Sequence, residues 1–162
     1  MKINKNIIYI ILSALAVILI TLFIFYNSSK SHSDSINDST FFSEIMTRTA
    51  TDEKASSNNY DWLTFRKQAH IIEFAALGMA IVCLSYSLKK LKINLYGYGL
   101  FYALAIAVTD EYIQSFSDRS SSTQDIVLDF CGVMLGFLIM IAIILIIEFI
   151  KHFFKAPKLA KG

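Results

Sequence analysis

Residues 7–26 read IIYIILSALAVILITLFIFY, twenty consecutive positions without a charged side chain. About 20 apolar residues, each adding about 1.5 Å of helix, cross the hydrocarbon core of a bilayer. Lys2 and Lys5 precede this run, and no small-residue cleavage site follows it. We therefore interpret it as a retained membrane-spanning helix and not as a signal peptide, so that an integral membrane protein is the first expectation.

Three further apolar segments follow, near residues 69–88, 93–109 and 125–147. The chain of 162 residues is 55% hydrophobic and only 17% charged, which is too apolar for a soluble domain of this length. The segment that starts at residue 93 opens with alternating Tyr and Gly, as interfacial aromatic belts do. The sequence therefore predicts an all-α fold, a polytopic membrane protein with four transmembrane helices.

We expect the chain to be divided into four parts. Residues 1–26 form a cytoplasmic N-terminus and the first transmembrane helix, and residues 27–65 form an extracytoplasmic polar loop. Residues 66–150 form a core of three transmembrane helices, and residues 151–162 form a basic cytoplasmic tail. Apolar residues at helical spacing predict a short interfacial helix within the polar loop: Phe41, Phe42, Ile45 and Met46.

Lysines dominate the segments that we place in the cytoplasm. The N-terminus, the turn at residues 89–92 and the tail together hold nine lysines and no acidic residue. The other side carries six basic residues among many more carboxylates. Because positive charge stays in the cytoplasm during insertion, we expect both termini there and the two polar loops outside. The lysines thus follow topology, and no basic, aromatic-interleaved surface indicates nucleic acid as a partner.

Polar side chains gather at the outer ends of the last three expected spans. Arg66, His70 and Glu73 share one helix face, and so do Asp125 and Asp129. Because these positions all fall on one side of the membrane, we predict an outward-facing pocket that serves binding or catalysis. Its candidate residues are Arg66, His70, Glu73, Asp110, Glu111, Gln114, Arg119, Asp125 and Asp129.

Glu73 and Asp129 are the costly members of this set, since they lie roughly one turn inside their spans. An ionisable group there costs at least a few kcal/mol unless it faces the protein interior, water or a partner. Arg66, His70 and Arg119 are the expected partners, but carboxylates outnumber them. The site would then recruit a proton, a cation or a basic ligand. The alternative is that the polar groups are ion pairs that only align the helices.

No metal site or cofactor is assigned, although a divalent cation remains an alternative. His70 and Glu73, three residues apart, could converge on one ion, and Asp110, Glu111 or Asp129 could complete an oxygen-rich shell. One imidazole without cysteine ligands disfavours a structural zinc site. Cys83 and Cys131 are expected at different depths in the membrane, which disfavours a disulfide between them.

Gly132 and Gly136 match the small-xxx-small pattern that lets transmembrane helices approach closely. We expect them to pack against another helix of the same bundle rather than to form a dimer interface. Ser122 and Asp125 resemble a capping box at the start of the last helix, which gives Asp125 a structural alternative to a role in the pocket.

Three stretches carry a family resemblance. The first is the serine-rich stretch of residues 28–50. The second is RKQAHIIEFAALG, residues 66–78, similar to a motif RK-x-x-H-x-x-E-(Y/F)-x-x-L-G. The third is DEYIQSF, residues 110–116, followed by Arg119, Asp125, Asp129, Gly132 and Gly136. Together they resemble the VanZ-like family of small bacterial membrane proteins, whose named member is associated with resistance to the glycopeptide teicoplanin. Phe74 stands where that family usually has Tyr, so a hydroxyl group there is not essential.

The resemblance implies a multi-pass protein of the bacterial plasma membrane with a role in glycopeptide tolerance at the cell envelope. It implies no particular reaction, so whether the protein is an enzyme stays open. The pocket could bind a membrane lipid, a cell-wall lipid precursor or a lipoglycopeptide. The protein could instead be a small intramembrane enzyme acting on an envelope lipid or peptidoglycan precursor, with His70 and Glu73 as acid–base groups. A structural or assembly role, in which the polar groups pair internally, is the third alternative. A channel is disfavoured because no span carries a polar stripe along its full depth.

Overall fold

The computed structural model describes residues 5–30, 62–89, 95–116 and 122–155, with side chains described except at residues 62–66 and 155. Four helices cover most of these residues, and the described residues contain no strand. They are α1 (Lys5–Ser28), α3 (Trp62–Lys89), α4 (Tyr96–Gln114) and α5 (Thr123–Lys155). The all-α fold expected from the sequence is confirmed. The expected interfacial helix at residues 41–46 lies outside the described residues, as does most of the expected cytoplasmic tail.

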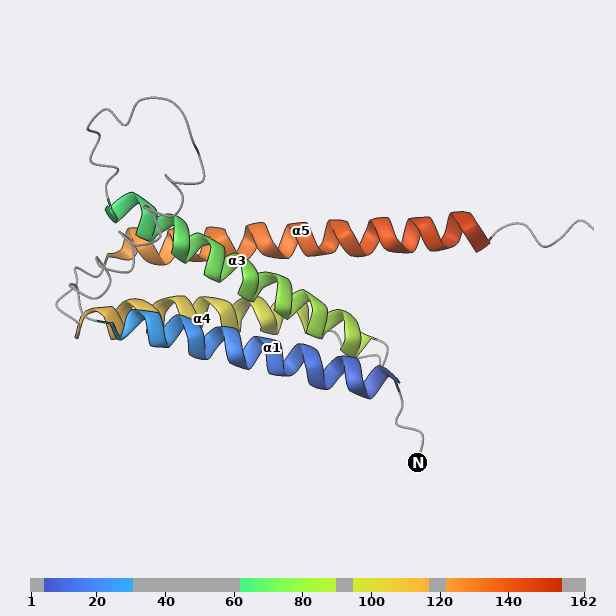
Figure 1. Cartoon of the computed structure of the whole chain (residues 1–162), viewed down its shortest axis with the longest axis horizontal. Helices are drawn as coiled ribbons and strands as arrows, with labels where there is room; N and C mark the ends of the chain where they lie inside the picture. Colours follow the sequence, from blue (N-terminus) through green and yellow to red (C-terminus); the bar gives the residue numbers. More distant parts are fainter. Residues whose placement is uncertain (1–4, 31–61, 90–94, 117–121, 156–162) are drawn as a thin grey trace, which may run out of the picture.

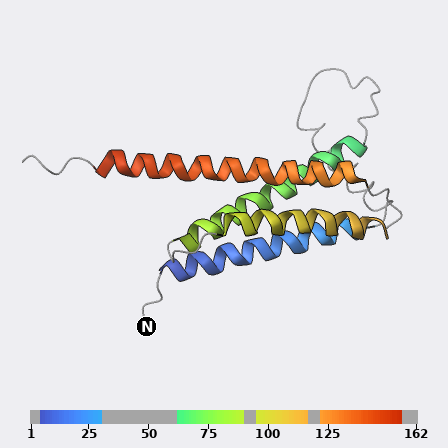
Figure 2. The ribbon, with the colours of Figure 1, turned by 180° about the vertical axis from the view of Figure 1, so that it is seen from behind.

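The helices alternate in direction along the bundle (Figure 1). The C-terminal ends of α1 and α4 lie at the same end as the N-terminal ends of α3 and α5, and the view from behind agrees (Figure 2). We call this end the polar end, because the polar residues of the expected pocket lie near it. The opposite end, where α1 begins and α3 ends, is called the lysine end, after Lys5 and Lys89. The antiparallel order brings residues far apart in the sequence to one end of the bundle.

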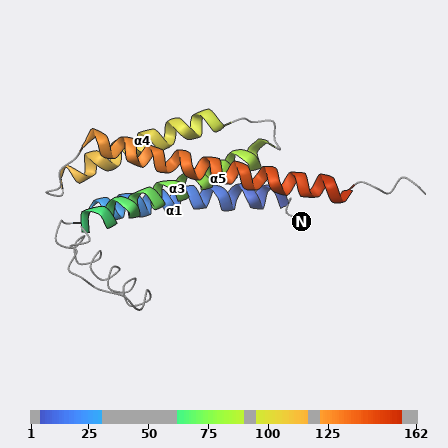
Figure 3. The same cartoon turned by 90° about the horizontal axis from the view of Figure 1, so that it is seen from above.

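α3 is the central helix, because it contacts each of the other three. Its most extensive contact is with α5, which it crosses obliquely (Figure 3). Apolar side chains at these contacts form the core of the bundle, including the buried residues Ile24, Phe74, Leu77, Val82, Ala103, Ala107 and Val133.

Three glycines let the backbones of α3 and α5 touch, and we call Gly78, Gly132 and Gly136 the glycine seam. A β-carbon added to Gly136 would overlap the backbone of Ala75, and one added to Gly132 would lie 2.8 Å from the carbonyl oxygen of Ile71. Gly78 faces the backbone of α5 in the same way. The structure thus places Gly132 and Gly136 against α3 within the bundle.

Three helices are long and apolar enough to cross a membrane: Lys5–Ser28, Lys67–Lys89 and Thr123–Phe154. Large apolar side chains such as Leu22 of α1 and Phe149 of α5 are exposed on the bundle, as lipid-facing side chains are. The four spans expected from the sequence therefore reduce to three on length and composition. The helix that drops out is α4. Its 19 residues are long enough, but tyrosines and glycines at its start and Asp110 and Glu111 near its end make it less apolar.

α4 also differs from the expectation at its C-terminal end. The sequence suggested that the span ended near Thr109 and that Asp110 opened a polar loop, whereas the helix continues to Gln114. The reason is tertiary: Asp110, Glu111 and Gln114 are buried and face the other helices, so this last turn is packed rather than solvated. This turn therefore brings three polar side chains into the bundle.

Candidate functional site

α1 contributes two polar residues at its last turn, Asn27 and Ser28. The Asn27 amide Nδ2 donates a hydrogen bond of 2.7 Å to Oε1 of Glu73 on α3. The Ser28 hydroxyl donates to Oδ1 of Asp110 on α4. Neither residue was among the sequence-based candidates. The available signal was their position at the end of an apolar run, at the same end of the bundle as the expected pocket.

Asp110 is the centre of the buried hydrogen bonds at the polar end. Its side chain is fully buried, and its two oxygens accept from different helical neighbours. Oδ1 accepts from Ser28, and Oδ2 accepts from Nε2 of Gln114 at 2.7 Å. The imidazole Nδ1 of His70 lies 3.8 Å from the same Oδ2. These contacts hold the carboxylate in one orientation, with α1, α3 and α4 all converging on it.

Glu111 connects α4 to the start of α5. Its Oε2 accepts a hydrogen bond of 2.9 Å from the backbone N–H of Ser122, and the Ser122 hydroxyl accepts one of 3.1 Å from the N–H of Gln124. Ser122 therefore caps the helix as its sequence position suggests. The reciprocal carboxylate comes from Glu111 and not from Asp125, which corrects the expected capping box. The carboxylate of Asp125 thus remains available to the site.

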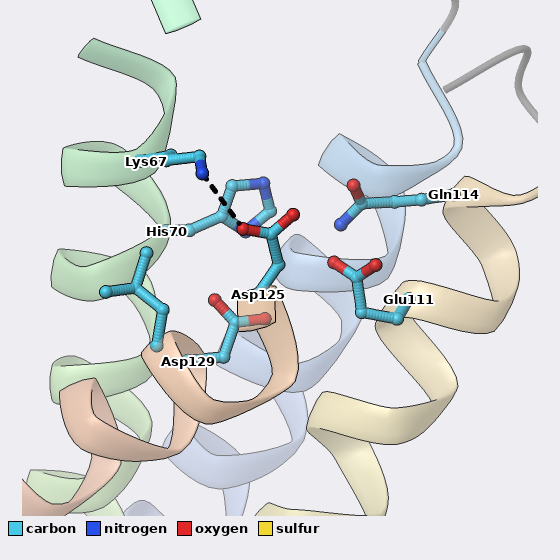
Figure 4. A pocket seen from close by; sticks show the side chains of 7 residues that line it. Lys67, His70, Glu111, Gln114, Asp125 and Asp129 are labelled. Carbon is cyan, nitrogen blue, oxygen red and sulfur yellow. Dashed lines mark ion pairs between the residues drawn. The ribbon is translucent and has the colours of Figure 1, made fainter. Parts of the chain in front are cut away.

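Lys67 and Asp125 form an ion pair at the rim of the site (Figure 4), with 3.2 Å between Nζ and Oδ1. Their side chains are 47% and 22% exposed, so this pair is in contact with the surroundings of the bundle. Lys67 belongs to the motif of residues 66–78, but it was not predicted to line the pocket. Its ammonium group lies among the carboxylates that line the site.

Asp129 stands apart from the other acids of the site. It is 2% exposed, yet its carboxylate takes part in no hydrogen bond or ion pair within the described parts of the chain. The side chain extends from α5 towards the space between His70 and Glu111 (Figure 4). A buried carboxylate without a partner is costly. Among the described residues, packing therefore does not offset the cost of burying Asp129.

A small cavity lies between these side chains, with a volume of about 10 Å³. That is about the space of one water-sized guest. Leu128 is its apolar wall, and six polar residues complete the lining (Figure 4): Lys67, His70, Glu111, Gln114, Asp125 and Asp129. The cavity and the adjacent Asp110 and Glu73 make up what we call the polar cluster.

Of the nine candidate residues, five line the cavity: His70, Glu111, Gln114, Asp125 and Asp129. Asp110 contacts two of these, His70 and Gln114. Glu73 is held by Asn27 of α1 and is not part of the cavity lining. The side chain of Arg66 and the whole of Arg119 lie outside the described residues. Both cysteines, Cys83 and Cys131, are free thiols.

One subset of the cluster has metal-ligating geometry. Ligand atoms of His70, Asp110 and Asp129 all lie within 4.8 Å of one another. The sequence had suggested His70 with Glu73 as the first two ligands, because they are three residues apart. The structure places Asp110 and Asp129 beside His70 instead. These two come from α4 and α5, so their proximity depends on how the helices pack.

Comparison with known proteins identifies the family. No curated protein and no solved structure matches the chain. The family model described as VanZ/LLP1 matches residues 8–148, which include α3, α4, most of α1 and α5, and every residue of the polar cluster. The resemblance inferred from the residue motifs is thereby confirmed. The chain belongs to the VanZ/LLP1 family.

Proposed function

We propose that this protein is a multi-pass membrane protein of the bacterial cell envelope whose polar cluster binds the charged group of an envelope ligand and so contributes to glycopeptide (teicoplanin) tolerance. The observation that carries the proposal is Asp129, a buried carboxylate that faces the cavity and has no partner among the described residues. A purely structural cluster would give this carboxyl group a partner, because burying it without one destabilises the fold, and the described residues supply none. A ligand that completes the site accounts for its retention.

The proposed topology has four spans, with both termini in the cytoplasm and the polar end outside. α4 falls short on composition, but it packs beside α1 at mid-span, where the hydroxyl groups of Thr21 and Tyr102 are 2.9 Å apart. Lys5 and Lys89 lie at the end opposite to the polar cluster, which agrees with retention of positive charge in the cytoplasm. A ligand would then reach the cluster from the outer leaflet.

The charge balance of the cluster defines the chemistry of the ligand. The described side chains include five carboxylates, against Lys67 and the imidazole of His70: Glu73, Asp110, Glu111, Asp125 and Asp129. Such a site favours a cationic group, or an anionic group bridged by a metal ion. The cavity is far too small for a whole lipid or glycopeptide. We therefore propose that only the charged tip of the ligand enters, while its apolar part stays in the membrane.

The test is direct binding by the full chain in lipid nanodiscs. Three ligands are compared: teicoplanin, a cell-wall lipid precursor, and a plain phospholipid. We expect saturable binding of at least one, and a loss of binding in Asp129→Asn and His70→Ala, while Tyr86→Phe at the lysine end binds as wild type. Tolerance of cells to teicoplanin should fall with the same two variants. Absence of saturable binding together with unchanged tolerance would overturn the proposal.

A second candidate function is catalysis on an envelope lipid or peptidoglycan precursor. The observation in its favour is the position of the His70 imidazole, 3.8 Å from a carboxylate that Ser28 and Gln114 hold in place. An imidazole beside a carboxylate can act as an acid–base group on water. Lipid profiles of a deletion strain and a His70→Ala strain should then change in the same direction. Identical profiles would leave binding as the function.

A further inference from the structure

The polar cluster contains three donor atoms that suit one ion. The imidazole of His70 and the carboxylates of Asp110 and Asp129 have ligand atoms within 4.8 Å of one another. Within this set, Nδ1 of His70 and Oδ2 of Asp110 are 3.8 Å apart. Donor atoms that share an ion through bonds of about 2.0–2.2 Å lie roughly 3–4 Å apart, so small side-chain rotations complete such a site.

Asp129 gives an independent reason to place a positive charge here. Asp129 is only 2% exposed and lines the cavity. Its carboxylate has no hydrogen bond or ion pair with any described residue. Figure 4 shows it directed towards the space beneath His70 and Asp125. Lys67 does not meet this need, since its Nζ is paired with Asp125 at 3.2 Å. A cation bound in the cavity would neutralise Asp129 directly.

The size of the cavity selects the kind of cation. A volume of about 10 Å³ admits one water-sized guest, such as a single metal ion. The mixture of one imidazole with carboxylates favours first-row transition metals such as Zn²⁺ and Mn²⁺ over Mg²⁺ and Ca²⁺, which prefer oxygen donors alone. The hydrogen bonds from Ser28 and Gln114 to Asp110 would orient that ligand.

We propose that His70, Asp110 and Asp129 bind one divalent transition-metal cation at the polar end of the bundle. The ion is held by α3, α4 and α5 together, so it joins three helices at one point. Its biological role rests on the proposed function: the bound cation bridges the acidic cluster to a phosphate or carboxylate group of the envelope ligand. This explains how a cluster of carboxylates can receive an anionic headgroup.

The experiment uses the full chain in nanodiscs, purified without a histidine tag and stripped with a chelator. Mn²⁺ is titrated and followed by electron paramagnetic resonance, and Zn²⁺, Mg²⁺ and Ca²⁺ are added as competitors. We expect one Mn²⁺ per chain, displaced by Zn²⁺ and not by equal concentrations of Mg²⁺ or Ca²⁺. Asp129→Asn and His70→Gln should each weaken Mn²⁺ binding by about 10-fold or more, and Tyr86→Phe should leave it unchanged.

Circular dichroism of each nanodisc sample shows whether the variant is folded. If one of the two variants fails to fold, the other still tests the proposal. Absence of stoichiometric Mn²⁺ or Zn²⁺ binding, or wild-type Mn²⁺ affinity in both variants, would overturn the metal site. Ligand binding measured with and without chelator separates this inference from the proposed function. If the ligand binds equally well with and without chelator, the metal site is contradicted and the proposed function is supported. If the chain binds the metal ion but none of the ligands, the proposed function is contradicted and the metal site is supported.

Discussion

α3 and α5 meet in two contrasting ways along one interface. In the glycine seam the two backbones touch, and no side chain separates Gly136 from Ala75. In the polar cluster, Asp129 lies three residues before Gly132, and there polar side chains of α3, α4 and α5 line a cavity. The comparison suggests a division of roles. The glycine seam sets the distance between α3 and α5, and the polar cluster provides the side chains that line the cavity. Stability and binding should therefore respond to different mutations.

The largest expected effect on stability is at the seam. Gly136→Ala places a methyl group on the backbone of Ala75, and the two helices must separate to admit it. We expect a loss of about 3 kcal/mol of unfolding free energy, because backbone cannot move aside as a side chain can. Chemical unfolding in mixed micelles measures it.

The matched control for the seam is Gly97→Ala near the start of α4. A β-carbon there meets no atom of the described residues within 4 Å outside its own turn of helix. We expect that variant to be as stable as wild type or slightly more stable, since alanine favours a helix over glycine. Equal destabilisation by the two glycine replacements would contradict the assignment of the seam.

The second effect is at Asp110, which belongs to the cluster but also joins helices. Asp110→Ala leaves the buried donors of Ser28 and Gln114 without their acceptor, and should cost about 2 kcal/mol of unfolding free energy. Asp110→Asn keeps one acceptor oxygen and should recover part of that stability without restoring metal binding. If both variants retain metal binding, Asp110 is not a metal ligand, and its role is in helix packing alone.

The smallest effect is expected at the rim. Lys67→Gln removes the ion pair with Asp125, whose partners are partly exposed, and should change the unfolding free energy by less than about 1 kcal/mol. The change should shrink further as salt is raised, because exposed charges are screened. Comparing unfolding at low and high salt checks both points. A loss as large as that of Gly136→Ala would show that the rim is part of the structural interface.

Much of the bundle was predictable from the sequence, because length and apolarity decide whether a helix can span a membrane. The spacing of Asp125 and Asp129 also placed both on one face of the last helix, and both line the cavity. Asn27 and Ser28 were missed because hydrogen bonds between helices depend on how each helix is rotated, and no local pattern reports that rotation. The same reason explains Glu73, which has the right spacing to join His70 but is turned towards α1.

The extension of α4 to Gln114 was missed for a related reason. Acidic residues such as Asp110 and Glu111 in a sequence predict that an apolar span has ended. Here the helix continues, because this turn is buried against neighbouring helices. The role of Glu111 as the partner of the Ser122 N–H likewise requires that α4 and α5 already lie side by side. Tertiary contacts therefore decide the details of the cluster, while the sequence predicts its composition.

The central claim is that Asp129 of the polar cluster serves binding and not stability, and Asp129→Asn tests it most directly. Unfolding free energy and Mn²⁺ affinity are measured on the same nanodisc preparation of this variant. The account predicts a protein at least as stable as wild type, because a buried carboxyl group without a partner among the described residues is replaced by an amide, and a Mn²⁺ affinity lowered by about 10-fold or more. A variant that loses stability while binding Mn²⁺ as wild type does would contradict the claim.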